Sequence, residues 1–197
     1  MSLKKNSILF FFIIAISILF SKKILANLEN ELALIEYLNK LDNFSVFFVQ
    51  SDGINISEGK ISISKNRIRV DYLLPSKILI ILDKNKAMYY NHDLDEDEFF
   101  DPKDTSAWFF FEVFNNKLFL QEAEFSLENN NIVLTKKGFN NDEEYVLKIY
   151  FENNPLIIRK ISLEVSDTLI DLSFFNHNYN ETFDEKAFKL INPSFFD

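Results

Sequence analysis

Asp93, Asp95 and Asp97 have the spacing with which a calcium-binding loop begins. The pattern then departs from such a loop. Glu98 stands where the turn needs a glycine, and Asp104 stands where a glutamate should bind the ion through both oxygens. We therefore interpret these alternating acidic residues as a solvated loop and expect no metal site there.

Other residues with catalytic or metal-binding chemistry are few. His92 and His177 are the only histidines, and neither has a partner at ligand spacing. The chain has no cysteine, which excludes disulfides, thiol chemistry and the lipidated cysteine of a bacterial lipoprotein. Three glycines leave no room for a Gly-x-Ser-x-Gly elbow, a phosphate loop or a dinucleotide-binding pattern. We expect neither an enzyme nor a cofactor.

Phenylalanine is the compositional outlier, with 23 residues in a chain of 197. Burial in the core is the default expectation for any one of them. As a set they suggest more, because a curved sheet with one aromatic and aliphatic face could hold acyl chains. Each methylene buried on such a face contributes about 0.8 kcal/mol without any hydrogen bond.

The first residues have the pattern of a secretory signal peptide. Lys4 and Lys5 precede an apolar run from Ile8 to Phe20, and the small residue Ala26 follows. The run is shorter than the ~20 residues that a membrane-spanning helix needs, so a permanent anchor is the weaker alternative. We expect residues 1–26 to be a cleaved signal peptide and residues 27–197 to form a single domain.

The charge of the chain limits its partners. Removal of the signal takes away four lysines and no acidic residue, which changes the formal charge from −9 to −13. Nucleic acids and anionic membranes need basic clusters, so neither is expected as a partner. A basic protein surface fits better. We expect a monomer.

Short alternating apolar runs separated by turn residues predict an antiparallel sheet. The predicted strands are 44–51, 54–64, 67–73, 77–82, 87–90, 124–128, 131–135, 145–151, 156–165 and 168–175. An amphipathic helix is predicted before them over about 28–41, where leucines and Ile35 recur at helical spacing. Between the two sets of strands, the Phe-rich segment 104–120 loses the strand period. It predicts one or two short helices with Asp104 or Thr105 as N-cap.

Several of these segments together resemble one known family. Glu58-Gly59-Lys60-Ile61-Ser62-Ile63 is followed by Arg67-Ile68-Arg69-Val70-Asp71-Tyr72-Leu73-Leu74-Pro75, and later by Asp83-Lys84-Asn85-Lys86 and Met88-Tyr89-Tyr90-Asn91. Phe44-Ser45-Val46-Phe47-Phe48-Val49-Gln50 lies upstream, and Asn192-Pro193-Ser194-Phe195-Phe196-Asp197 ends the chain. In this order and spacing, the segments resemble the outer-membrane lipoprotein carrier (LolA) family.

The resemblance implies a fold of mainly β structure with helices (α+β). The strongly curved antiparallel sheet would form an unclosed barrel, with helices filling and covering its concave side. Alternation puts Ile61, Ile63, Ile68, Val70 and Tyr72 on one face of the meander. The full set of expected acyl-chain-binding residues is Ile61, Ile63, Ile68, Val70, Tyr72, Met88, Tyr90, Trp108, Phe109 and Phe111.

The resemblance also implies a lid over the concave side, for which Trp108 to Phe114 is the expected segment. An ordinary buried helix is the alternative. In the family, an arginine followed by proline at the end of the second strand hydrogen-bonds the lid. Here Lys65-Asn66 stands at that place with Arg67 close by. Lys65 and Arg67 are therefore the lid-latch candidates, against the alternative of a solvated turn lysine.

The function implied by the resemblance is that of a periplasmic chaperone. It would accept lipid-modified proteins from an inner-membrane ABC-type release complex, shield their acyl chains, and deliver them to an outer-membrane receptor. Two alternatives remain: a general lipid or glycolipid carrier of the cell envelope, and a regulatory binding module of the same fold.

Overall fold

The computed structural model describes residues 32–38, 40–116 and 118–196, and the expected signal peptide lies outside them. The chain divides into two units, Met1–Tyr37 and Leu38–Asp197. The described residues of the first unit, 32–37, are helical, as the leucine period predicts. Among the described residues, no helix has the length and apolar character needed to cross a membrane.

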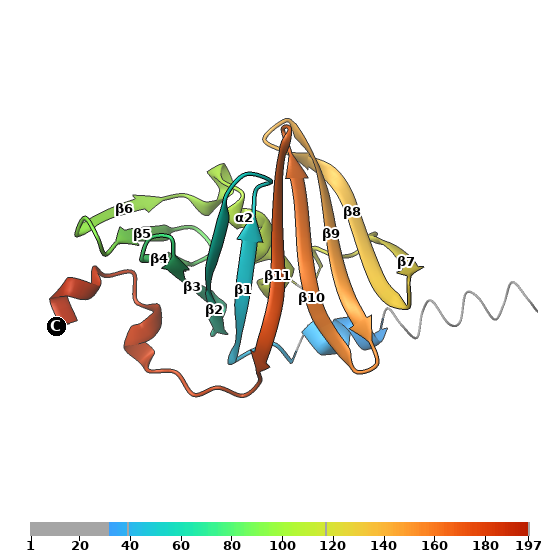
Figure 1. Ribbon diagram of the computed structural model, residues 1–197, viewed down its shortest axis with the longest axis horizontal. Coiled ribbons are helices and arrows are strands. Elements are labelled where there is room, and N and C mark those ends of the chain that lie inside the picture. The colour runs from blue at the N-terminus through green and yellow to red at the C-terminus, as the bar shows by residue number, and fades with distance from the viewer. Residues whose placement is uncertain (1–31, 39, 117, 197) are drawn as a thin grey trace, which may run out of the picture. The chain divides into compact units, whose positions relative to one another are not determined.

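The second unit is built on one antiparallel sheet of eleven strands (Figure 1). Its strands are β1 (Phe44–Ser51), β2 (Ile56–Ser64), β3 (Arg67–Leu74), β4 (Ile78–Leu82), β5 (Ala87–Asn91), β6 (Glu96–Phe100), β7 (Glu124–Glu128), β8 (Asn131–Asn140), β9 (Glu143–Asn153), β10 (Leu156–Val165) and β11 (Thr168–Asn178). The helices are η1 (Pro102–Asp104), α2 (Ala107–Asn115), η2 (Glu185–Phe188) and η3 (Pro193–Phe196).

The strand order is β6-β5-β4-β3-β2-β1-β11-β10-β9-β8-β7. Two meanders, β1–β6 and β7–β11, therefore meet where β1 pairs with β11 in the middle of the sheet. The prediction of a mainly β, antiparallel sheet is confirmed.

The expected strong curvature is wrong. The sheet is open, with β6 and β7 at its ends, and it is not strongly curled. Figure 1 shows β4–β6 running at a steep angle to β8–β11. Twist between neighbouring strands accumulates across the sheet and splays its ends apart, so they do not bend together into a barrel.

Two local predictions also need correction. The acidic segment expected as a loop contains the sixth strand, β6, which pairs with β5 from Glu96 opposite Asn91 to Phe100 opposite Ala87. The residue before α2 is Ser106, not Asp104 or Thr105. Thr105 instead ends the short helix η1.

Candidate functional site

The register of β2 and β3 puts the first five expected site residues on one face of the sheet. Ile61 lies opposite Val70, Ile63 opposite Ile68, and Gly59 opposite Tyr72. Directly opposite residues of an antiparallel pair point to the same side. Ile61, Ile63 and Ile68 are buried, and Val70 and Tyr72 are partly exposed.

This side, which we call the apolar face, continues across the joint between the meanders. Following the pairings from β1 to β8, its buried members are Phe44, Val46, Phe48, Phe174, Leu172, Ile158, Ile161, Leu163, Tyr145, Leu147, Ile149, Phe151, Ile132 and Leu134. The alternation of each strand thus combines into one aromatic and aliphatic surface.

Tyr72 brings a polar group to the apolar face. Its hydroxyl donates to Gln50 Oε1 at 2.7 Å, and its ring meets Phe48 edge-on at 5.3 Å between centroids. Burial raises the pKa of Tyr72 to about 12, because the phenolate would lose its hydration. The side chain is therefore a neutral, hydrogen-bonded part of the wall.

Met88 and Tyr90 do not share this face. Met88 lies opposite Ile81, and Ile81 lies opposite Arg69, which alternates with Ile68 and Val70. Met88 and Tyr90 belong to a cluster with Leu79 and Ile81 on the opposite face, against which Leu190 packs. Both were expected among the acyl-chain-binding residues, and the register puts them on the face opposite to that of Ile68.

The helix α2 supplies the remaining expected site residues. Phe109 is buried and its ring lies 4.7 Å from that of Tyr145, which places this side of α2 on the apolar face. Phe111 is also buried, and α2 contacts β3. Trp108 is partly exposed and meets Phe119 edge-on at 5.4 Å. The helix thus covers apolar side chains of both meanders.

On the opposite face, the strands β1–β6 are contacted by the C-terminal segment, defined here as residues 181–195. Figure 1 shows it in red, leaving β11 and passing along the side of β2–β5. Glu181 N donates to Asn43 O at 2.7 Å, and Arg69 Nη1 donates to Ala187 O at 2.8 Å. Arg69 also holds Asp71 through two hydrogen bonds of 2.8 and 2.6 Å.

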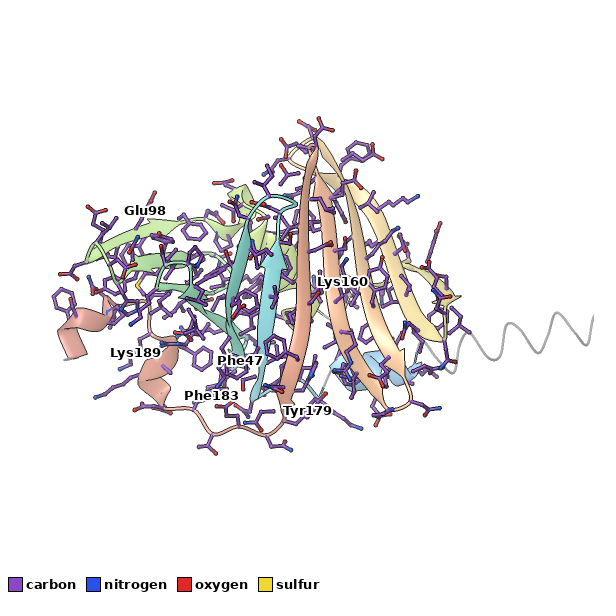
Figure 2. All side chains as sticks on the ribbon, viewed as in Figure 1. Phe47, Glu98, Lys160, Tyr179, Phe183 and Lys189 are labelled. Carbon is purple, nitrogen blue, oxygen red and sulfur yellow. The ribbon has the colours of Figure 1, made fainter. Side chains whose placement is uncertain are left out.

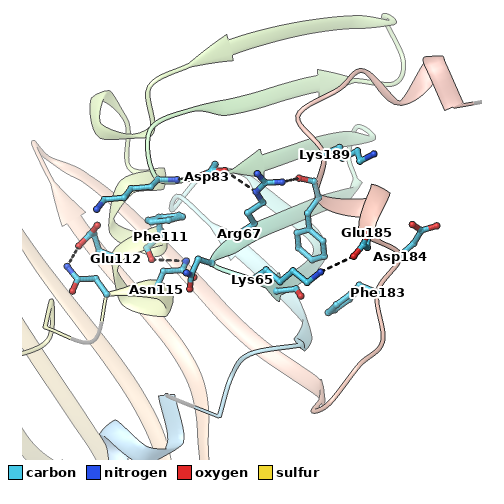
Figure 3. A pocket seen from close by; sticks show the side chains of 15 residues that line it. Lys65, Arg67, Asp83, Phe111, Glu112, Asn115, Phe183, Asp184, Glu185 and Lys189 are labelled. Atoms are coloured by element: carbon cyan, nitrogen blue, oxygen red, sulfur yellow. Dashed lines mark hydrogen bonds and ion pairs between the residues drawn. The ribbon is translucent and has the colours of Figure 1, made fainter.

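The two expected latch residues bind this segment and the β4–β5 turn. Lys65 Nζ lies 3.2 Å from Glu185 Oε1, and both side chains are largely exposed. Arg67 donates from Nε to Asp83 at 2.9 Å and from Nη1 to Phe188 O at 3.1 Å (Figure 3). All these partners lie outside α2, so the pair ties the C-terminal segment to the β2–β3 hairpin.

A cavity of about 830 Å³ lies beside the β2–β3 turn (Figure 3). Its lining comes from four places: the turn 64–67, the β4–β5 turn at 83–84, the end of α2 at 111–116, and the C-terminal segment at 183–189. Phe111, Phe183 and Phe188 give it an apolar part, and charged and uncharged polar residues form the rest.

Sequence reasoning missed the ion pairs of the opposite face. Burial alone would raise the pKa of Glu181, but hydrogen bonds from Ser45 and Lys60 hold it below its usual value. Lys60 Nζ lies 3.0 Å from Glu181 Oε1. Only the pair of Arg69 with Asp71 could have been predicted from the sequence. These opposite charges are two residues apart on one strand and therefore lie on the same face.

The described part of the chain contains no group of three or more side chains able to hold a metal ion. The alternating acidic residues do not lie in one loop. The β5–β6 turn contains Asp93 and Asp95, and β6 contains Asp97. Asp95 accepts a hydrogen bond from the Tyr90 hydroxyl at 2.9 Å.

Comparison with known proteins identifies a family. The family described as "Outer membrane lipoprotein carrier protein LolA" matches residues 39–191. No curated protein matches the chain. Among solved structures, an uncharacterized conserved protein from Thermus thermophilus has a TM-score of 0.53 at 9% identity, covering 83% of this chain and 93% of that one.

MucB is a second structural neighbour, with a TM-score of 0.49 at 13% identity, covering 83% of this chain and 62% of MucB. MucB in complex with MucA(peri) gives 0.44 at 13% identity. At such identities the likeness to solved structures concerns the fold alone.

Proposed function

We propose that this chain, which belongs to the outer membrane lipoprotein carrier protein LolA family, shields the acyl chains of lipoproteins on the apolar face of its sheet. Members of this family are carriers and not enzymes. The observation that supports the proposal best is the continuous apolar face, which runs through both meanders and is covered by α2.

Acyl chains would bind between the apolar face and α2. Ile61, Ile63 and Ile68 are already buried, so a chain can reach them only if α2 and its aromatic side chains move away. The movement is favourable when the acyl chains bury more apolar surface than α2 gives up. About four to six methylenes, at ~0.8 kcal/mol each, supply the few kilocalories per mole required.

The acyl-chain-binding residues proposed on this face are Ile61, Ile63, Ile68, Val70, Tyr72, Phe109 and Phe111, with Trp108 at the margin. Release would need no covalent step, because cargo passes to whichever protein binds the acyl chains more tightly. The proposed cycle runs in the periplasm. Residues 27–197 would receive cargo from an inner-membrane ABC-type complex and deliver it to an outer-membrane receptor.

A matched pair of valine substitutions tests the face. Val70 on β3 and Val146 on β9 are both partly exposed, but Val70 belongs to the apolar face and Val146 to the opposite one. We expect Val70→Gln to weaken binding of a triacylated lipopeptide by about tenfold and Val146→Gln to leave it unchanged, because a buried amide without a partner costs roughly 1–2 kcal/mol.

The fluorescence of Trp108, the only tryptophan, provides the readout. Saturating lipopeptide should change its emission and quencher accessibility, whereas the same peptide without acyl chains should not. Equal binding by both valine variants would contradict the face assignment. Mass spectrometry of the purified protein tests the alternative, since copurified phospholipid or glycolipid, with no lipoprotein bound, would favour a general lipid carrier.

A further inference from the structure

The strand β6 ends the sheet, and within the described residues its outer edge pairs with no other strand. An edge strand presents unpaired backbone N–H and C=O groups in alternation, which can template the addition of another strand. Natural proteins usually block such edges with charge, bulges or covering segments. The side chains of β6 therefore decide what this edge accepts.

These side chains are strongly acidic. Glu96, Asp97 and Glu98 are exposed within the strand, and further exposed carboxylates flank it at Asp93, Asp95 and Asp101. Figure 2 shows Glu98 at the outer margin of the sheet. A second copy of this chain paired through β6 would put carboxylates opposite one another, which is destabilising. The charge thus disfavours a homodimer and favours a basic strand.

Apolar side chains lie next to these carboxylates. Phe99 is 43% exposed, with Lys86 Nζ over its ring at 4.0 Å. Asn192 Nδ2 donates to Asp97 Oδ1 at 2.8 Å, which brings the C-terminal segment beside β6. There, Ile191 and Phe195 are 41% and 78% exposed. Exposed apolar groups rimmed by charge are typical of protein-binding surfaces.

We propose that β6 and the adjoining residues Ile191 and Phe195 bind an extended, lysine- or arginine-rich segment of a partner protein, which adds to the sheet as a twelfth strand. Backbone hydrogen bonds to β6 would give affinity, and the carboxylates would select basic residues. Alternate apolar side chains of the segment would pack on Phe99, Ile191 and Phe195. Recognition of a protein segment at the edge of the sheet does not depend on acyl-chain binding to the apolar face.

A synthetic peptide of about eight residues with alternating lysine and valine is the probe, since β6 itself has five residues. The control peptide has the same sequence with N-methyl groups on alternate backbone nitrogens. This keeps the charge of the peptide and removes half of its backbone N–H donors. We expect the first peptide to bind at low salt and to slow hydrogen exchange of the β6 amides. The control should bind at least about tenfold more weakly.

Charge reversal gives the matched protein variants. Glu96→Lys with Glu98→Lys on β6 should weaken binding by about tenfold or more, because two attractive charges become repulsive. Glu124→Lys with Glu128→Lys on β7, the other edge strand, makes the same change in net charge and should have little effect.

Three results would overturn the proposal. One is the absence of measurable binding at low salt. Another is equal binding of both peptides, or equal weakening by the two charge reversals, which would mean unspecific charge attraction. The third is concentration-dependent self-association that protects the β6 amides, which would make a second copy of the chain the occupant of the edge.

Discussion

Gly59 shows how one residue can support the apolar face by having no side chain. It lies opposite Phe48 on β1, and the Phe48 ring occupies the space above it. A Cβ atom built at Gly59 would lie 2.4 Å from Asp71 O and 2.7 Å from the Phe48 ring. Both distances are far below van der Waals contact, so any side chain there must displace the ring and shift the backbone.

We therefore expect Gly59→Ala to lower the free energy of unfolding by about 1–3 kcal/mol, the usual cost of overpacking. Urea denaturation measures the change. The matched control is Glu58→Ala on the same strand, where the side chain is exposed and the expected change is within about 0.5 kcal/mol. If the two variants were equally stable, the Phe48 ring could move away from residue 59 without a loss of free energy of unfolding.

At the residue scale, the sequence predicted which side chains of β2 and β3 share a face, because period-two alternation is independent of the rest of the fold. It did not predict the face of Met88. That face depends on how residues 83–86 connect β4 to β5. The connection decides whether Met88 pairs with Ile81 or with the residue before or after Ile81, which would point to the other face. The partners of Lys65 and Arg67 were also beyond prediction, since they include residues about 120 positions away.

At the scale of elements, the two faces of the sheet are covered in different ways. The apolar face is covered by α2 through ring contacts such as that of Phe109 with Tyr145. The C-terminal segment lies on the opposite face of the β1–β6 meander and is fixed by side-chain donors, including Arg69 to the carbonyl of Ala187. Apolar contacts tolerate sliding, whereas directed hydrogen bonds fix position, so α2 is the element better suited to move.

We expect Arg69→Lys to loosen the C-terminal segment. Lysine can keep one contact to Asp71 but lacks the planar group that also reaches Ala187 O, so the contact to the segment is lost. Hydrogen exchange of amides in residues 181–190 should accelerate by about five- to thirtyfold, equivalent to roughly 1–2 kcal/mol.

Arg159→Lys is the matched control. Arg159 also makes two hydrogen bonds to one carboxylate, but that carboxylate belongs to Glu152 on β9 and not to the C-terminal segment. Its substitution should leave exchange in residues 181–190 unchanged. If both variants accelerate exchange equally, the segment responds to general stability and not to its contact with Arg69.

The strand β6 marks the limit of prediction for elements. Acidic residues are uncommon in strands, and Glu96-Asp97-Glu98 has no apolar alternation, so the sequence indicated a loop. The segment nevertheless forms a strand, because its backbone pairs with β5. An edge strand needs backbone hydrogen-bond partners on one side only. Most other strands could be predicted, because each has its own apolar period and is bounded by Asn-, Pro- or Gly-containing turns. The second half of β8 was missed, since the expected strand 131–135 continues to Asn140.

At the scale of the whole molecule, the chain is acidic, with a formal charge of −9, and it begins with an apolar run of the length typical of a signal peptide. We expect cleavage after Ala26 and recovery of residues 27–197 from the periplasmic fraction. Intact mass measurement identifies the new N-terminus. Ala26→Lys should block cleavage, since the processing site needs a small residue. Recovery of the uncleaved natural chain from membranes washed with high salt would contradict this expectation.

The central pairing of β1 with β11 has a consequence for biosynthesis. The two strands are separated by more than 110 residues, yet each depends on the other for one of its hydrogen-bonded edges. The N-terminal meander therefore has an open inner edge until nearly the whole chain has been made. Such non-local pairing is slow, because the entropy of closing a long loop is lost before the contacts form. If the chain is exported as expected, so late a completion of the fold would keep it unfolded during its passage, since the two meanders can join only after β11 has been made.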